Sequence, residues 1–419
     1  MASRRSFLKT AAMSVPALTR FPTAQGPARF PDPDHVSPGD FWEEIGKLYT
    51  LSPSRIYLNT GGLGPAPDPV LKRFREETDR LQTLSETGHN LFDPARETVA
   101  SFFGADPDEV AFTRNATEGN ATVAAGLRLT SGDEIIIDAS AHPGGAIPWL
   151  NQLKRNGVRV RTFQPDSIRQ ETTLERIEAL ISDRTRVIQI SHVTAPTGIL
   201  LPAKRIAQIA ASHGVWFHID GAQSAGMLPI DLHDIGCDSY ATSGHKWLGA
   251  PHGTGILFIR KARLDDVWPT EVGAYSDAGY HLPDTLEYVP TARRHESGTR
   301  NAPLVAAVAE AVSFMSRIGM DRVRERGLAL ARRLRAGLLT VDSVEILTPE
   351  PDPMRGSILT FRSEKMAYSE LNQALGREHH LRLRVVTEQN LNAIRVSMHV
   401  FNSEEHVDRV IEGVRDVLG

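Results

Sequence analysis

Short apolar runs recur through the middle of the chain without alternating polar positions. The clearest are Glu134–Asp138, Arg186–Val193, Val215–Asp220 and Gly255–Arg260. Continuous apolar runs rich in β-branched residues are typical of strands buried on both faces of a sheet. Segments with helical character lie between them, as at Thr173–Ile181 and Lys204–Ser212. This alternation predicts an α/β fold with a mostly parallel sheet between helices.

After about residue 300 the pattern changes to long helices and shorter strands. Helices are predicted at Asn301–Met315, Asp321–Leu338 and Ser403–Leu418, with strands at Ser357–Arg362 and Ala393–Ser397. Such a mixture predicts a second, smaller α+β domain at the C-terminus.

The expected organisation therefore has four parts. Residues 1–30 are expected to be an export signal and linker, and residues 31–55 a segment that packs on the small domain. Residues 56–300 are expected to form the large domain and residues 301–419 the small one.

The export prediction rests on Ser3–Lys9, which holds Arg4 and Arg5, a bulky apolar pair and a lysine before a mildly apolar stretch. This pattern resembles a twin-arginine signal, which predicts use of the twin-arginine export machinery and a periplasmic or otherwise extracytoplasmic location. The alternative is a basic terminus that contains two arginines by chance. No apolar run reaches 18 residues, so stable membrane insertion is not expected.

Composition narrows the possible functions. The 419 residues are 41% hydrophobic and 23% charged, as in ordinary globular proteins. Lys and Arg number 47 and Asp and Glu 51, giving a net charge of −4 and no basic surplus for binding nucleic acid. The single cysteine, Cys237, excludes an intramolecular disulfide and a cysteine-based zinc site, and no metal site is predicted.

A lysine and an aspartate carry the clearest chemical signal. Asp220 ends an apolar run and is followed by Gly221, and Lys246 lies in Ser243–Trp247 after another apolar segment. Ligands of parallel α/β sheets bind beyond the carboxyl ends of the strands. A lysine between apolar and aromatic neighbours is a candidate for a lowered pKa and for Schiff-base chemistry, although a surface lysine is the simpler alternative.

Together these motifs resemble the class V aminotransferase family of pyridoxal-phosphate (PLP) enzymes, of fold type I, in its isopenicillin N epimerase-like branch. The resemblance extends roughly from Ile56 to Gly419. It implies that Lys246 binds PLP through a Schiff base, that Asp220 pairs with the pyridinium nitrogen and that Gln223 reaches the phenolic oxygen. A carboxylate at that nitrogen helps the ring to accept electrons from the substrate Cα.

The resemblance also implies a phosphate site at a helix N-terminus. Asn115 and Glu118 have the spacing of a capped helix, whose free N–H groups favour an anion. The residues implied to bind the phosphate are Ala116, Thr117, Ser243 and His245. Thr299 would reach the phosphate of the neighbouring subunit, which predicts a homodimer with shared active sites.

Two further residues are implied to contact cofactor and substrate. His142 would stack on the PLP ring, and Arg395 would bind the substrate α-carboxylate as a bidentate pair. A hydrogen-bonded loop histidine and a surface salt bridge are the respective alternatives. No cysteine lies in the segment 385–390, where desulfurases carry their nucleophile, and Ala195 replaces their asparagine. Persulfide chemistry is therefore not expected.

The predicted activity is PLP-dependent removal of the Cα proton of an amino acid or a similar amine. Transamination is the first choice, because one lysine can move the proton, whereas epimerisation usually requires a second acid–base group. Epimerisation is the second choice and carbon–sulfur β-elimination the third. A protein that only binds a ligand is less favoured, because the whole set of site residues is present.

Overall fold

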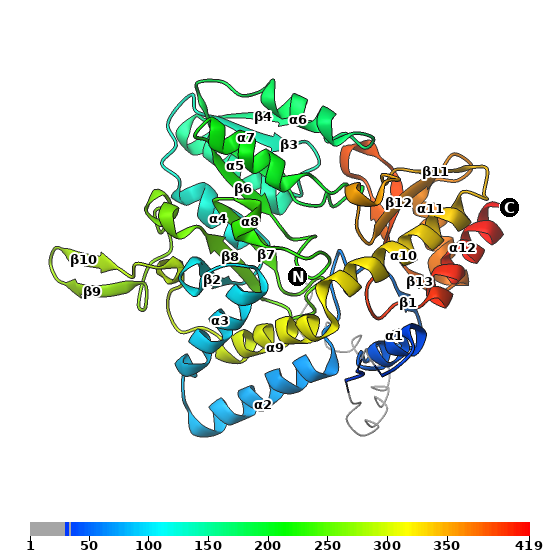
Figure 1. Ribbon diagram of the computed structural model, residues 1–419, viewed down its shortest axis with the longest axis horizontal. Helices are drawn as coiled ribbons and strands as arrows, with labels where there is room; N and C mark the ends of the chain where they lie inside the picture. The colour runs from blue at the N-terminus through cyan, green and yellow to red at the C-terminus, as the bar shows by residue number, and fades with distance from the viewer. Residues whose placement is uncertain (1–29, 33–34) are drawn as a thin grey trace, which may run out of the picture.

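The computed structural model describes residues 30–32 and 35–419, so the predicted twin-arginine segment lies outside the described residues. Its largest sheet has seven strands in the order β2-β8-β7-β6-β5-β3-β4 (Figure 1). Only β8 runs antiparallel to its neighbours β2 and β7. The predicted α/β class with a mostly parallel sheet is therefore confirmed. The strands are β2 (Val110–Thr113), β3 (Glu134–Asp138), β4 (Arg159–Phe163), β5 (Thr185–Ser191), β6 (Trp216–Asp220), β7 (Ser239–Ser243) and β8 (Gly255–Ile259).

Helices cover both faces of this sheet, which explains the continuous apolar runs. Ile135 and Ile137 of β3 belong to one buried cluster with residues of α4 and α5, whereas Ile136 between them belongs to another with residues of α7 and α9. Alternate side chains of a strand point to opposite faces, so both sets must be apolar. The helices of this layer are α2 (Asp68–Leu84), α3 (Phe92–Phe102), α4 (Ala116–Gly126), α5 (Pro143–Asn156), α6 (Gln170–Glu178), α7 (Ala203–Ser212), α8 (Leu232–Ile235) and α9 (Ala302–Ile318).

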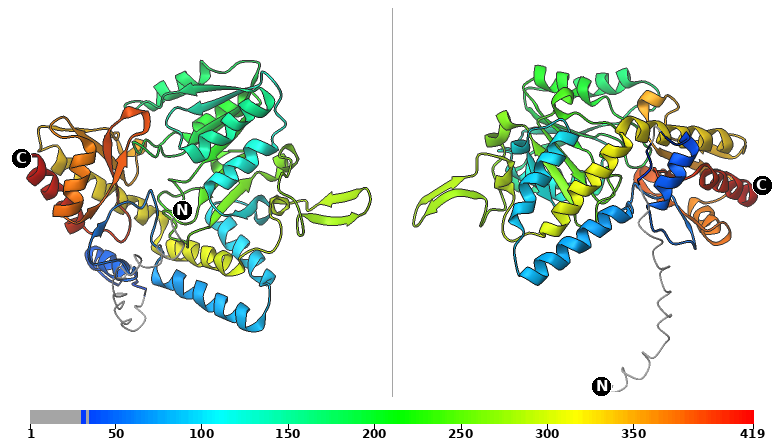
Figure 2. Two further views of the ribbon diagram at one scale, coloured as in Figure 1. Left: turned by 180° about the vertical axis from the view of Figure 1, so that it is seen from behind. Right: turned by 60° about the horizontal axis from the view of Figure 1, so that its bottom comes forward.

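A second, smaller α+β unit lies beside the large sheet, in orange and red in Figures 1 and 2. Its antiparallel sheet has the order β11-β12-β15-β14, and a two-stranded parallel pair joins β1 to β13. Its strands are β1 (Ile56–Tyr57), β11 (Val344–Ile346), β12 (Ile358–Ser363), β13 (Leu381–Arg382), β14 (Arg384–Val386) and β15 (Ala393–Ser397). Its helices are α10 (Met320–Leu338), α11 (Tyr368–Glu378) and α12 (Glu404–Leu418).

The residues that make up the two apolar cores do not change at the predicted boundaries, residues 55 and 300. The buried face of α9 packs with α2 and α3 in the core of the large sheet, and the second core takes its first C-terminal members from α10. Leu58 belongs to the second core, although it follows residue 55. Phe41 of α1 (Pro38–Lys47) belongs to the first core together with Phe401. The chain therefore crosses between the cores near both of its ends.

A hairpin of β9 (Asp277–His281) and β10 (Thr285–Tyr288) projects from the body of the large sheet (Figure 2). Its tip exposes Tyr280 and Leu282. Within the described residues, no single helix is long and apolar enough to cross a membrane, and α9 with α10 meets that test only as a pair bent by 74°.

A buried ion pair fixes the segment that leads into α9. Glu296 accepts hydrogen bonds from Arg96 at 2.9 and 3.1 Å and from the backbone N–H of Phe112 at 2.6 Å. Arg300 makes a further ion pair with the same carboxylate at 2.5 Å. Arg96 and Glu296 are 3% and 2% exposed, so neither charge has water as an alternative partner.

We expect Glu296→Gln to lower the free energy of unfolding by about 3–5 kcal/mol, because it leaves buried arginine charge uncompensated. Urea unfolding followed by circular dichroism measures the change. The matched control is Glu345→Gln, which breaks the exposed pair with Arg362 at 2.7 Å and should cost less than about 1 kcal/mol. Equal midpoints for the two variants would contradict the role of the buried pair.

Candidate active site

Lys246 lies in a tight turn after β7, against the loop that follows β1. The N–H of Gly64 donates to the carbonyl of His245 at 2.9 Å, and a Cβ at Gly64 would lie 1.7 Å from the carbonyl oxygen of Lys246. Only glycine permits this approach. Burial lowers the pKa of Lys246 to about 8, although the charge of Asp220 acts in the opposite direction. The side chain is therefore a base that can lose its proton near neutral pH.

Asp220 ends β6 at the same edge of the sheet and is 6% exposed. Its Oδ1 accepts from the N–H of Ala222 at 3.0 Å, and its Oδ2 accepts from Nδ2 of Asn120 at 3.1 Å. A Cβ at Gly145 would lie 2.7 Å from this Oδ2, so α5 passes directly over the carboxylate. Both oxygens of Asp220 therefore have a hydrogen-bond donor within the chain.

A chain of buried hydrogen bonds extends from Asp220 into the sheet. Asn120 Oδ1 contacts Nε2 of His218 at 2.9 Å, and Nδ1 of His218 contacts the hydroxyl of Ser239 at 2.8 Å. Burial lowers the pKa of His218 to about 3, so the ring is neutral and has one donor and one acceptor nitrogen. Trp216 completes the chain by donating to Ser239 at 2.9 Å. Every donor then points toward Asp220, which stabilises its negative charge.

Gln223 is held on both sides of its amide. Nε2 donates to the carbonyl of Gly61 at 2.8 Å, and Oε1 accepts from Nε1 of Trp247 at 2.9 Å. An amide nitrogen has two hydrogens, so one donor of Gln223 stays available. A Cβ at Gly61 would lie 2.8 Å from Gln223 Oε1 and 3.0 Å from Nη2 of Arg395, which places these two side chains around one glycine.

Arg395 is a buried cation held by neutral groups. Its side chain is 1% exposed, and it donates to the carbonyl of Ala195 at 2.9 Å and to Oδ1 of Asn59 at 3.2 Å. Burial lowers the pKa of Arg395 to about 9, and its Nε has no hydrogen-bond partner among the described residues. A buried charge normally has an opposite charge beside it. Arg395 is therefore poised to bind a carboxylate.

The predicted phosphate site gathers at the N-terminus of α4. Asn115 caps the helix by accepting from the N–H of Glu118 at 2.9 Å. The N–H of Ala116 donates to the hydroxyl of Ser243 at 2.9 Å, so these two predicted phosphate-binding residues contact each other, and their role in binding phosphate stays a prediction. The oxygen of Ser243 accepts this hydrogen bond, so its own O–H can donate to a phosphate. A Cβ at Gly144 would lie 2.4 Å from Oγ1 of Thr117, which brings α5 against the exposed Thr117.

The two predicted histidines border the same site. His142 caps α5, and its Nδ1 accepts from the N–H of Gly144 at 3.1 Å. Burial and the charge of Lys246 lower the pKa of His142, which keeps the ring neutral beside the lysine. His245, next to Lys246, contacts the carbonyl of Thr254 through Nδ1 at 3.1 Å, and burial lowers its pKa as well.

Thr299 is not part of this group. It lies in the segment after Glu296 and borders a separate cavity of about 420 Å³ together with Arg114, Glu118 and Glu271. Its predicted contact with the phosphate of a second subunit therefore stays a prediction. Cys237 is fully buried, which raises the pKa of its thiol and fits a packing role.

The chemistry of the site fits PLP. The amine of Lys246 makes no hydrogen bond to a described residue, and its lowered pKa suits attack on an aldehyde. Asp220 offers a carboxylate oxygen for a ring nitrogen, and the α4 N-terminus with Ser243 and Thr117 offers donors for a phosphate. Glycine at 144 and 145 lets α5 lie closer to Thr117 and Asp220 than any other residue would allow.

Three residues of the site were not predicted. Asn120 lies five residues after the helix cap Asn115. It is a polar residue among the small residues of a buried helix, and this could have marked it as a candidate. Asn59 and Arg384 belong to no sequence motif that would have marked them as site residues. The charge of Arg384 lowers the pKa of Lys246, so it too acts at this site.

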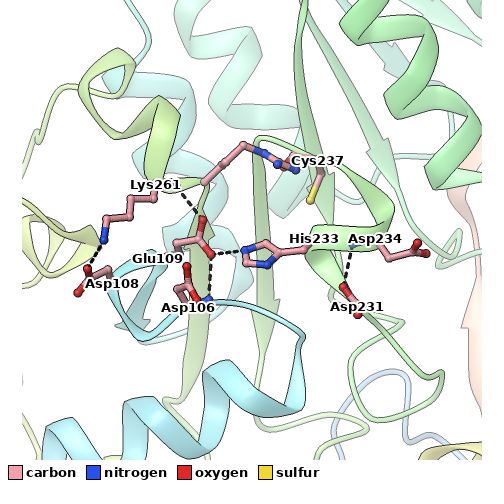
Figure 3. Close-up of polar contacts among 9 residues, drawn as sticks. Asp106, Asp108, Glu109, Asp231, His233, Asp234, Cys237 and Lys261 are labelled. Atoms are coloured by element: carbon pink, nitrogen blue, oxygen red, sulfur yellow. Dashed lines mark hydrogen bonds and ion pairs between the residues drawn. The ribbon is translucent and has the colours of Figure 1, made fainter.

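Asp106, Glu109 and His233 form another polar cluster, next to the start of β2 (Figure 3). Their candidate ligand atoms lie within 4.8 Å of one another. Both oxygens of Glu109 already accept hydrogen bonds, from Asp106 N–H at 2.9 Å, His233 Nε2 at 2.6 Å and Lys261 N–H at 2.8 Å. The cluster therefore ties η3 (Pro107–Glu109) to α8 and to the end of β8.

Comparison with known proteins identifies relatives along most of the chain. The family model "Aminotransferase class-V" matches residues 56–410. An isopenicillin N epimerase from Streptomyces clavuligerus is 30% identical over 393 residues, which cover 90% of this chain and 98% of the relative.

Solved structures share the fold. The cysteine desulfurase from Thermococcus onnurineus NA1 superposes with a TM-score of 0.82 at 24% identity, covering 90% of this chain and 98% of that one. C-DES with glycine covalently linked to its PLP cofactor superposes with a TM-score of 0.78 at 27% identity, covering 87% and 97%. These matches confirm the predicted fold type I.

The lowered pKa of Lys246 predicts how covalent attachment of PLP depends on pH. The neutral amine is the nucleophile, so the attachment rate should rise about tenfold per pH unit below pH 8 and level off above it. Stopped-flow absorption after mixing the cofactor-free protein with PLP measures this rate. A rate that keeps rising to pH 10, as for an ordinary lysine, would contradict the assignment.

Loss of the Asn120 amide should weaken the site through Asp220. We expect Asn120→Ala to raise the dissociation constant of PLP about tenfold, because a buried carboxylate loses one donor. Thr122→Ala on the same helix is the control, since that hydroxyl bonds only to the carbonyl of Glu118. If both variants bind PLP as the wild type does, the hydrogen-bond chain has no part in holding the cofactor.

Proposed function

We propose, from the premise that the chain belongs to the class V aminotransferase family of PLP-dependent enzymes, that it is an aminotransferase acting on an amino acid or a similar amine. One observation carries the proposal. A lysine whose pKa burial lowers to about 8 faces a buried aspartate and a buried arginine at the carboxyl edge of the sheet. This is the set of charges that amino-acid chemistry on PLP requires.

Each side chain has a defined task. Bound PLP supplies an electron sink for negative charge at the substrate Cα. Arg395 holds the α-carboxylate and so orients the substrate, while Asp220 keeps a proton on the ring nitrogen. Lys246 takes the Cα proton on Nζ and can release it again because of its lowered pKa.

The proposal of transamination rests on the number of groups that can carry a proton. The groups whose charges act on Lys246 are Asp220, Arg384 and Arg395. Asp220 is occupied by two donors, and arginines stay protonated near neutral pH. Lys246 alone among these groups can both take and return a proton, which suits a transfer on one face of the substrate.

Epimerisation is the second candidate, because an isopenicillin N epimerase is 30% identical over most of this chain. It requires a second group that protonates Cα from the opposite face. His142 would be the group to test, since the charge of Lys246 acts on its pKa. Carbon–sulfur β-elimination stays the third candidate.

The test is a visible spectrum of the purified protein with PLP, before and after addition of amino acids. An aminotransferase converts the band of lysine-bound PLP to the pyridoxamine form with one amino donor and recovers it with a keto acid. A band that never converts, while solvent deuterium enters Cα, would contradict transamination and favour epimerisation. Lys246→Ala should abolish the band, whereas Lys154→Ala, an exposed lysine of α5, should leave it unchanged.

We also propose that the protein is exported and that its substrate is an extracytoplasmic amine, on the basis of Arg4 and Arg5. A fusion of residues 1–40 to a folded reporter should leave the cytoplasm. Export that persists after replacing both arginines by lysine would contradict a twin-arginine route.

We further propose a homodimer with shared active sites, in which Thr299 approaches the phosphate of the second subunit. Sedimentation of the PLP-loaded protein should give twice the mass of one chain. Mixing Lys246→Ala with Thr299→Ala protein should then restore part of the lost activity, and a monomeric mass would contradict sharing.

A further inference from the structure

Two arginines stand directly opposite each other in the small sheet. In the antiparallel pair of β14 and β15, Arg384 is the register partner of Arg395. Partners in such a pair project from the same face with their Cβ atoms about 4.5–5.5 Å apart, and like charges at these positions destabilise the sheet. A structural role does not explain this arrangement, because either position could carry a neutral residue.

Both guanidinium groups have donors without an acceptor. Nη1 of Arg384 and Nε of Arg395 are buried and have no hydrogen-bond partner among the described residues. Arg384 is paired through Nη2 with Glu388, whereas Arg395 contacts only the neutral oxygens of Ala195 and Asn59. Unfilled charged donors in a buried place indicate that anions bind there.

The charges of the pair act on the side chains of the site. The positive charges of Arg384 and Arg395 both act on Lys246, and those of Arg384 and Glu388 both act on His142. Arg384 thus lies on the His142 side of the site, and Arg395 on the side of Gln223 and Gly61.

The segment after β14 anchors Arg384 at this place. Gln389 donates to the carbonyl of Ala139 at 2.7 Å, which joins this segment to the turn between β3 and α5. Gln389, Asn390 and Asn392 have φ values of 54°, 56° and 49°. Residues other than glycine adopt this left-handed conformation rarely, and such residues concentrate at functional sites. The segment therefore joins the small unit to the turn that precedes His142.

We infer that Arg384 forms a second acid-binding subsite, and that the substrate is an amino acid with an anionic group, such as a carboxylate, on its side chain. This inference rests on the proposed function. Arg395 binds the α-carboxylate and Arg384 binds the side-chain acid, so each guanidinium obtains an anionic partner. Glu388 is a positioning residue, because it holds Nη2 and leaves Nη1 for the substrate.

The test compares unreactive diacids and monoacids of equal length on the PLP-loaded protein. Isothermal titration calorimetry gives the dissociation constants of succinate and butyrate, and of glutarate and valerate. We expect at least one diacid to bind the wild type about tenfold or more tightly than its monoacid. Arg384→Gln should weaken diacid binding about ten- to hundredfold and change monoacid binding less than about twofold.

Arg377→Gln is the matched control, since it removes the same charge from an exposed position of α11 in the same unit. It should leave all four constants unchanged. Arg384→Lys, which keeps the charge but loses the planar fork, should give an intermediate diacid affinity and also serves if Arg384→Gln does not fold. Equal binding of diacids and monoacids by the wild type, or a diacid preference that survives in Arg384→Gln, would overturn the inference.

The same samples separate the two hypotheses. The absorption band of lysine-bound PLP is recorded before each titration. An absent band contradicts the proposed function, whereas a normal band with equal binding of the two acid classes contradicts only the second subsite.

Discussion

The site depends on keeping a lysine amine and an aspartate carboxylate together in a place from which water is largely excluded. Burial alone disfavours the charged form of both groups, and their mutual attraction offsets part of that cost. The balance at Lys246 is a pKa of about 8. The backbone of Gly64 packs closely against the backbone of Lys246, and Asn120 holds the carboxylate of Asp220 in place through a hydrogen bond.

The two apolar cores meet around these charges. Asp220 ends β6 and Lys246 follows β7 of the large sheet, whereas Arg395 comes from β15 of the small one. Asn59, which bonds to Arg395, lies between β1 and the loop that packs on Lys246. The crossings of the chain between the cores therefore bring side chains from both units to one place, and a change in how the units pack would alter the contacts of Arg395.

Much of this arrangement could be predicted from the sequence, because strand ends and glycine turns leave a clear pattern. The observed bounds of β3 and β15 match the predicted ones, and Asp220 and Lys246 were singled out by their positions at or after apolar runs. Arg395 was expected from the family resemblance instead. Helix ends were less accurate: the helix predicted at Thr173–Ile181 extends from Gln170 to Glu178, because polar residues of its first turn carry no apolar signal.

Contacts that depend on register or on long-range packing could not be predicted. Arg384 faces Arg395 only because of the pairing of β14 with β15, and strand register between distant segments leaves no local signal. The bond from Ala116 to Ser243 joins residues 127 positions apart, and α9 packs with α2 and α3, which lie at least 200 positions before it in the sequence.

The most direct test of the central claim is chemical identification of the residue that carries the cofactor. The protein is loaded with PLP, reduced with borohydride to make the linkage permanent, digested and analysed by mass spectrometry. The account predicts that the pyridoxyl phosphate mass is found on the peptide containing Lys246, in a stoichiometry near one per chain. Modification of a different lysine, or of none, would contradict it.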